Sequence, residues 1–209
     1  MKREYKTQRI ISCHLGTGGS SVCAIDCGKS INNSMGFTPL EGLMMNTRSG
    51  DLDLGVIFYI MFKENISPED TETILNKKSG VLGVFKNSSD LRDVIKSIDN
   101  DYKAKMAFNM YVRRVKKYIC YYALLLKKAD IILFTDSIGV GVPLIREGIC
   151  QGLDFFGIKL DKTKNKNYTK GIQDISTSNS ETRILVLPTD EEIMIAREAY
   201  KEYNHDNRH

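Results

Sequence analysis

The chain has 209 residues, enough for one large or two small domains, and its 42% hydrophobic and 27% charged content is ordinary for a globular protein. The net charge of +4 is spread along the chain; it suits an anionic small ligand and argues against a nucleic-acid-binding protein. No apolar run approaches a membrane span, and residues 1–6 lack the apolar region of a signal peptide, so we expect a cytoplasmic protein. The five cysteines lack zinc spacing, which predicts reduced structural thiols.

The first predicted elements are three strands over residues 8–35, joined by a glycine-rich turn at 14–20 and a second turn at 26–29. Consecutive backbone N–H groups in a glycine turn form a concave anion site, and glycine lets phosphate approach without a Cβ in the way. The first turn is therefore a candidate phosphate cradle. His14 beside it is a candidate cation or hydrogen-bond donor, with a purely structural role as the alternative.

Residues 36–55 have little periodicity but many glycines, which predicts an ordered functional loop leading into a helix. The loop contains Arg48, whose planar and permanently charged guanidinium suits a transferring phosphoryl group. The alternative is that Arg48 pairs with Asp51 or Asp53 and fixes the loop. The apolar run over 55–63 that follows is predicted to be a buried helix.

Three helices are predicted next. Ser67 is a typical N-cap followed by proline, which indicates a helix ending near 78–80, and a second short helix is expected over 90–98. The strongest helix, over 101–128, has an apolar stripe formed by Phe108, Tyr111, Val115, Ile119, Tyr122 and Leu126. Its basic face, made by Arg113, Arg114, Lys116 and Lys117, is expected to be solvated.

The rest of the chain is predicted as a buried strand over 131–135, a turn at 136–139, a helix over 143–152, an exposed loop over 161–182, a strand over 183–187, a helix over 191–203 and a polar tail over 204–209. Hairpins therefore come first and are followed by helices interleaved with single strands, which indicates an α/β protein.

A more specific pattern runs through residues 14–51 and includes the segment Ser34-Met35-Gly36-Phe37-Thr38-Pro39-Leu40-Glu41-Gly42. This stretch closely resembles the signature of the acetate kinase family. The resemblance continues through Ser79-Gly80-Val81-Leu82-Gly83, Ser88-Ser89-Asp90-Leu91-Arg92-Asp93, Phe134-Thr135 and Pro188-Thr189-Asp190-Glu191-Glu192, and so covers nearly the whole chain.

The resemblance implies the second, C-terminal domain of an acetate kinase, with a ribonuclease-H-like, actin-like ATPase fold built on a mixed sheet with flanking helices. It also implies a division into a nucleotide-binding domain over 1–190 and a helix and tail over 191–209 that would pack on an N-terminal domain. The family reaction is the reversible transfer of a phosphoryl group from ATP to acetate, giving ADP and acetyl phosphate, and its cofactors would be ATP and Mg²⁺.

The family roles are carried over only where residues match. His14 and Arg48 match the catalytic residues that stabilise the transferring phosphoryl group, and Glu191 matches a magnesium-associated glutamate. The implied nucleotide-binding residues are His14, Gly16, Thr17, Gly18, Asp90, Leu91, Arg92, Asp136, Ser137, Ile138 and Gly139. These roles suit phosphoryl transfer, which depends mainly on positioning and charge neutralisation.

The chain also departs from the family. Family chains are about twice as long, and the missing first half carries further active-site residues. Where the family has Gly-Gly-Ile-Gly-Glu-Asn, this chain has Asp136-Ser137-Ile138-Gly139-Val140-Gly141, which adds Cβ atoms and a negative charge beside the nucleotide. Each change would cost on the order of 1–3 kcal/mol of binding if the backbone needs glycine. Milder departures are Thr17, Asn46 and Leu54.

Two hypotheses on the function follow. In the first, a separate chain supplies the N-terminal half, and the two assemble an acetate kinase. In the second, the chain is a non-catalytic remnant of a split or truncated gene that forms only a homodimer. A propionate or butyrate kinase is a further alternative. We expect the isolated chain to be inactive, and we expect the helix over 191–203 to expose Ile193, Met194 and Ile195, to fold back, or to dock on another chain.

Overall fold

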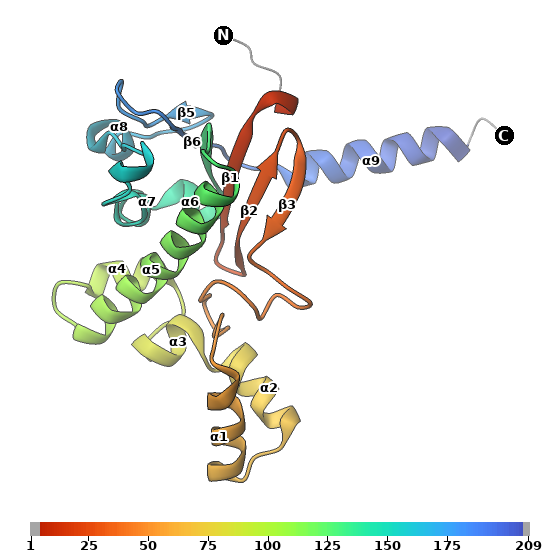
Figure 1. Ribbon diagram of the computed structural model, residues 1–209. Coiled ribbons are helices and arrows are strands. Elements are labelled where there is room, and N and C mark those ends of the chain that lie inside the picture. Colours follow the sequence, from red (N-terminus) through yellow and green to blue (C-terminus); the bar gives the residue numbers. More distant parts are fainter. Residues whose placement is uncertain (1–4, 207–209) are drawn as a thin grey trace.

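The structure is a computed structural model that describes residues 5–206, and these residues form a six-stranded mixed sheet in the order β3-β2-β1-β4-β6-β5 (Figure 1). The strands are β1 (Arg9–Leu15), β2 (Ser20–Asp26), β3 (Lys29–Asn33), β4 (Ile131–Thr135), β5 (Gln173–Asp174) and β6 (Arg183–Val186). β1 pairs antiparallel with β2 and parallel with β4, and β4 pairs parallel with β6. The predicted three-strand meander and the mixed sheet are confirmed.

Alternating side chains of β1 bury one face of the sheet against helices. Ile11, Cys13 and Leu15 are completely buried, as are Val22 and Ala24 on β2. This period of two is what a strand with one core-facing side requires. The core therefore lies directly beneath the strands that end at the glycine-rich turn.

The helices are α1 (Leu54–Glu64), α2 (Pro68–Lys77), α3 (Gly80–Phe85), α4 (Leu91–Ser97), α5 (Tyr102–Leu125), α6 (Asp136–Gly141), α7 (Pro143–Cys150), α8 (Lys162–Lys166) and α9 (Glu191–Asp206). Two 3₁₀ turns, η1 (Tyr5–Thr7) and η2 (Asp154–Phe156), complete the elements. The long helix α5 packs on β1 and β2 and also contacts α3, α4 and α7 (Figure 1). The predicted stripe on α5 is buried except for Phe108, which is half-buried.

Side-chain caps explain where the predicted helices begin. The Ser67 hydroxyl accepts a hydrogen bond from the Asp70 N–H at 3.0 Å, and Pro68 occupies the first turn of α2. Asp90 accepts from the Arg92 N–H at 2.8 Å at the start of α4. Such caps satisfy N–H groups that have no partner inside the helix. The starts of α2 and α4 are therefore confirmed.

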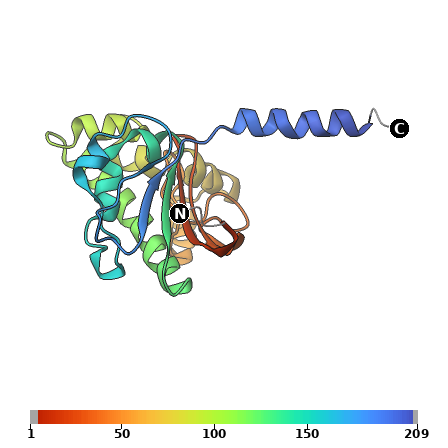
Figure 2. The ribbon, with the colours of Figure 1, turned by 90° about the horizontal axis from the view of Figure 1, so that it is seen from above.

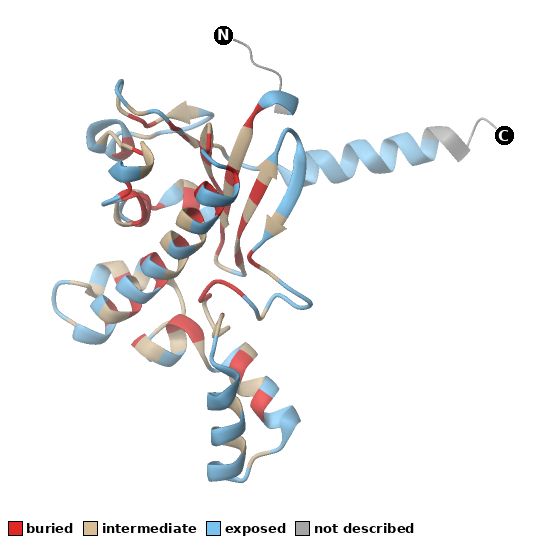
Figure 3. Ribbon diagram, viewed as in Figure 1, coloured by how far each residue is buried: buried red, intermediate tan, exposed pale blue. Residues whose placement is uncertain are grey.

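The prediction for residues 55–63 is half right, because α1 is a helix but none of its residues is buried. Phe62 is 85% exposed, and Leu54, Phe58 and Tyr59 are exposed as well. Figure 1 shows α1 and α2 extending below the sheet, and Figure 3 shows α1 coloured almost entirely as exposed. Apolar composition favoured burial, but the position of α1 leaves its apolar side chains uncovered.

Two expectations of solvent exposure were also wrong in part. The region over 161–182 contains α8 and β5, and Asn165, Ile175 and Thr182 within it are buried. On α5, the Arg114 guanidinium donates to the backbone carbonyls of Gly42 and Asp51, each at 3.1 Å. The basic face therefore anchors the loop over 34–53 in addition to meeting solvent.

The last helix, α9, extends away from the rest of the molecule (Figure 2). Ile193, Met194 and Ile195 are exposed on it, so within this chain the helix does not fold back, and docking on another chain stays a prediction. The helix continues to Asp206, so residues 204–206 of the predicted tail are helical, and residues 1–4 and 207–209 lie outside the described residues. Within the described part of the chain, no helix is long and apolar enough to cross a membrane.

Candidate active site

Three chain segments meet at one edge of the sheet. Because β1, β4 and β6 run parallel, the glycine loop after β1, Asp136 after β4 and Pro188 after β6 all lie at the carboxyl ends of the strands. Open α/β sheets bind ligands at this edge. The parallel pairing thus brings together sequence motifs that are more than 120 residues apart.

The glycine loop, residues 16–19, is held by hydrogen bonds at its base. The Gly16 N–H donates to the Gly19 carbonyl at 3.0 Å, and the Ser20 hydroxyl donates to the Gly16 carbonyl at 3.4 Å. The Tyr111 hydroxyl lies 3.1 Å from the Ser20 hydroxyl, and burial raises the pKa of Tyr111, which keeps it a neutral hydrogen-bonding group. A Cβ on Gly18 would meet open space, so the tip of the loop is accessible.

Arg48 lies beside this loop. A Cβ placed on Gly19 would be 3.5 Å from Nη1 of Arg48, and the same nitrogen lies 3.5 Å from the Met45 sulfur. Among residues 5–206, no carboxylate pairs with Arg48. A half-buried guanidinium without a carboxylate is available to an incoming anion.

The alternative role for Arg48, pairing with Asp51 or Asp53, is wrong. Asp53 instead caps α1 by accepting from the Gly55 N–H at 2.8 Å. Asp51 accepts from the Lys117 ammonium at 2.7 Å and from the Tyr118 hydroxyl at 2.9 Å. The two acids are thus used to fix the loop without Arg48.

The surroundings of Asp51 favour its charged form. Burial raises its pKa, but hydrogen bonds from Lys117, Tyr118 and the Gly42 N–H outweigh burial and hold the pKa of Asp51 below its usual value. The Gly42 N–H lies 2.8 Å from the carboxylate. Asp51 therefore joins the loop over 34–53 to α5 as an ionised group.

An open hollow of about 500 Å³ adjoins Arg48. Its lining residues are Gly18, Thr47, Arg48, Glu72, Thr73, Asn76 and Lys77. The lining comes from the glycine loop, the loop over 34–53 and α2, and most of it is polar. The hollow therefore offers room for a charged ligand next to the unpaired guanidinium.

On the β4 side, the His14 imidazole contacts the carboxylate of Asp136. His14 Nε2 lies 3.1 Å from Oδ2 of Asp136, and His14 Nδ1 lies 3.0 Å from the Thr135 hydroxyl, so both ring nitrogens have partners. The sequence predicted a negative charge near the nucleotide but gave no indication of this pair. Asp136 also fills the space beside Gly16, where its carboxylate leaves no room for a Cβ.

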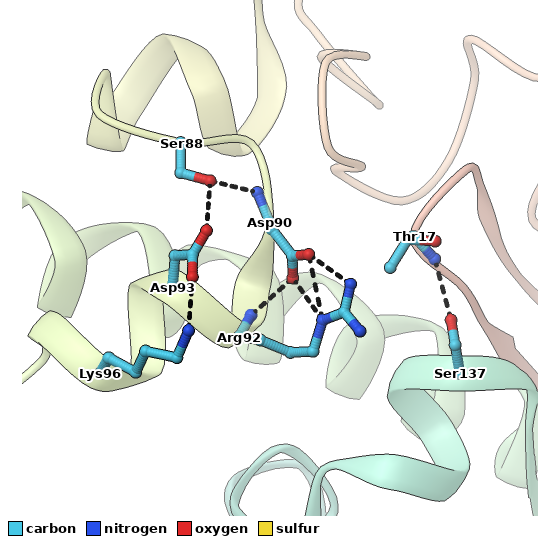
Figure 4. A network of polar contacts seen from close by, with 7 residues as sticks. All are labelled: Thr17, Ser88, Asp90, Arg92, Asp93, Lys96 and Ser137. Atoms are coloured by element: carbon cyan, nitrogen blue, oxygen red, sulfur yellow. Dashed lines mark hydrogen bonds and ion pairs between the residues drawn. The ribbon is translucent and has the colours of Figure 1, made fainter.

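One hydrogen bond joins the tip of the glycine loop to α6. The Thr17 N–H donates to the Ser137 hydroxyl at 3.2 Å, as the right side of Figure 4 shows. Ile138 and Gly139 also belong to α6, but both are buried. Of the predicted nucleotide-binding residues of this turn, Asp136 and Ser137 therefore present side chains at the loop.

The segment over 88–96 contains the other residues that the sequence predicts to contact the nucleotide. Arg92 pairs with Asp90 at 2.6 Å, and hydrogen bonds from Arg92 lower the pKa of Asp90 (Figure 4). Asp93 is held in turn by Ser88 and Lys96, at 2.9 and 2.8 Å. Leu91 is fully buried, so the structure places its side chain in the core and not toward a ligand.

Arg146 on α7 supports α6, and no sequence pattern predicts this role. It is completely buried and donates to the carbonyls of Gly139 at 2.8 Å and Val140 at 2.6 Å, and to the Asn165 side chain at 2.7 Å. Burial lowers the pKa of Arg146 to about 10. From the sequence, an arginine in a short helix is predicted to be exposed to solvent. Its partner Asn165 lies 19 residues away in the chain, and no local pattern predicts their contact.

Glu191 begins α9 and its side chain is exposed. Among the described residues, no group of three or more His, Cys, Asp or Glu side chains could hold a metal ion. Glu191 therefore offers a single carboxylate, and a magnesium ion here would need other ligands, such as phosphate oxygens.

The mixed sheet and its flanking helices are those of an actin-like ATPase domain, as solved structures confirm. The chain belongs to the acetokinase family, whose model matches residues 1–197. It is 48% identical over 200 residues to an acetate kinase of Caldicellulosiruptor saccharolyticus, an alignment that covers 95% of this chain and 50% of that protein.

Two of the similar solved structures show the extent of the match. The acetate kinase of Porphyromonas gingivalis has a TM-score of 0.90 and 41% identity, covering 95% of this chain and 50% of the other. A propionate kinase of Francisella tularensis has a TM-score of 0.84 and 38% identity, covering 91% and 48%. The chain thus spans about half the length of the relatives it matches.

Proposed function

We propose that this chain provides the nucleotide- and phosphoryl-binding half of an acetate kinase. In the proposed reaction, a carboxylate oxygen of acetate forms a bond to the γ-phosphorus of ATP, and the bond to the ADP oxygen breaks. Arg48 is the observation that carries the proposal. Its guanidinium lies beside an accessible glycine loop and, in the described part of the chain, has no carboxylate partner.

The proposed roles follow from charge and position. Arg48 would bind two oxygens of the transferring phosphoryl group, and the N–H groups of residues 16–18 would bind phosphate oxygens. His14 would donate a hydrogen bond to the same phosphoryl group. Asp90, Arg92 and Ser137 would position the nucleotide. Preorganised donors of this kind stabilise the charge of a phosphoryl-transfer transition state.

Magnesium would neutralise phosphate charge when bound. The residues of this chain fit that ion only in part, because Glu191 is one exposed carboxylate without a neighbouring cluster among the described residues. We propose that Glu191 orients an ion that the phosphates themselves carry.

We further propose that the active form is a complex in which another chain completes the site. The exposed apolar residues of α9, Ile193, Met194 and Ile195, support a covering partner. A separate N-terminal half of an acetate kinase is the partner we favour, and a second copy of this chain is the alternative.

A complementation assay tests this function. The chain is mixed with the part of the C. saccharolyticus acetate kinase that it does not match, and ATP-dependent acetyl phosphate is trapped as a hydroxamate. We expect product from the mixture and none from either part alone. No product above background, together with no ATP binding by calorimetry, would identify the chain as a non-catalytic remnant.

The same assay addresses the acid substrate. Acetate and propionate are compared at equal concentrations, because one similar structure is a propionate kinase. We expect faster turnover with acetate.

A further inference from the structure

We propose that Asp136 is an internal counter-ion of the candidate site: its carboxylate occupies the anion position between His14 and the glycine loop, and a polyphosphate binds only by displacing it. The inference rests on the proposed function for the location of the phosphate site. It adds that the affinity of this site is set by a negative charge within the chain.

The position of the carboxylate is the first argument. Oδ2 of Asp136 lies 3.1 Å from Nε2 of His14, and the same oxygen fills the space beside Gly16. An acceptor oxygen of a phosphate at the loop would need this same volume and this same imidazole nitrogen. The carboxylate therefore competes with the ligand both sterically and electrostatically.

The backbone is the second argument. Asp136 has a φ of 64°, in the left-handed region that glycine adopts freely and that aspartate tolerates. The fold consequently does not require a side chain here, since glycine would take up this conformation with less strain. What aspartate adds at this position is its carboxylate.

The contrast with Arg48 is the third argument. Arg48 borders the same loop and has no carboxylate partner within residues 5–206, whereas His14 is already paired. A ligand with one phosphate group can reach Arg48 without disturbing Asp136. A longer polyphosphate that also covers the loop near Gly16 has to displace the aspartate side chain.

The test uses the full chain and inorganic tripolyphosphate, measured by calorimetry. Asp136→Gly and Asp136→Asn are compared with the unchanged chain, and Asp99→Asn, which removes an exposed carboxylate elsewhere, is the matched control. We expect about tenfold tighter tripolyphosphate binding in both Asp136 variants and no change in the control. The amide resonances of residues 16–18 should shift on titration.

The outcomes separate this inference from the proposed function. Tighter tripolyphosphate binding in the Asp136 variants, without phosphoryl transfer in the complementation assay, would support the counter-ion role of Asp136 and contradict the proposed kinase function. Phosphoryl transfer in the complementation assay, with equal tripolyphosphate affinity in the unchanged chain and the three variants, would support the proposed kinase function and overturn the counter-ion role of Asp136. Failure of the Asp136 variants to bind tripolyphosphate more tightly overturns the inference, provided that their circular dichroism spectra match that of the unchanged chain.

Discussion

The loop over residues 34–53 and the β4–α6 turn border the same glycine loop, but their carboxylates contact different partners. In the first region, the carboxylate of Asp51 accepts hydrogen bonds from Lys117 and Tyr118 and does not pair with Arg48. In the second, the carboxylate of Asp136 is directed at His14. The comparison shows that, at the same loop, the Arg48 guanidinium has no carboxylate partner in the described part of the chain, whereas the His14 imidazole already contacts a carboxylate of the chain itself.

Arg48 should show the largest effect. Arg48→Ala is expected to lower turnover in the complementation assay about 100- to 1,000-fold, because it removes a preorganised charge from the proposed phosphoryl site. The unfolding free energy should change little, since the described contacts of the guanidinium are weak. Arg113→Ala, on the exposed face of α5, is the control and should keep full turnover.

A substitution of Arg146 tests the β4–α6 turn, because Arg146 donates hydrogen bonds to carbonyls of α6. Arg146→Ala leaves the carbonyls of Gly139 and Val140 without their donor and opens a cavity, so we expect a loss of about 3 kcal/mol in unfolding free energy. Urea denaturation measures this loss. A stability equal to that of Arg113→Ala would contradict the role of Arg146 in holding α6.

Asp51 links stability to pH. Asp51→Asn should cost about 1–2 kcal/mol at pH 7, where the carboxylate is ionised and accepts three hydrogen bonds in the folded state. The pKa of Asp51 is lowered on folding, so its stabilisation is fully present above the unfolded value of about 3.9 and is lost as the pH falls through the folded value. The difference between the two proteins in urea denaturation should therefore shrink below about pH 4.

Ser137 should show the smallest effect. Ser137→Ala removes the hydrogen bond from the Thr17 N–H, an exposed contact between the two regions, and should cost about 0.5–1 kcal/mol. Thermal unfolding monitored by circular dichroism measures this, with Ser178→Ala on an exposed loop as the control. A larger loss would show that the glycine loop depends on α6 more than the contacts indicate.

The features that local patterns determine were predicted well. The strands around the glycine loop alternate buried and partly exposed side chains, and α5 has the three- and four-residue spacing of a helix. Ser67 and Asp90 mark helix starts through hydrogen bonds to nearby N–H groups. Such signals lie within a few residues of the feature that they predict.

The features that depend on distant partners were missed. α3 is six residues long and starts at a glycine without a side-chain cap, so its sequence contains little helical signal. Burial of Arg146 depends on Asn165, and pairing of His14 depends on Asp136, both brought together only by the tertiary fold. The exposure of Phe62 on α1 is of the same kind, because composition does not specify what covers a helix.

The central position of β1 has a consequence for how the site can open. β1 carries His14, leads into the glycine loop, and is hydrogen-bonded along its length to β2 on one side and β4 on the other. Successive N–H groups of a strand point alternately to its two neighbours, so each β1 amide exchanges with solvent deuterium when the ladder on its own side, to β2 or to β4, opens. Amide exchange along β1 should therefore be slow on both of its sides, and the glycine loop is anchored to a strand that has a paired neighbour on each side.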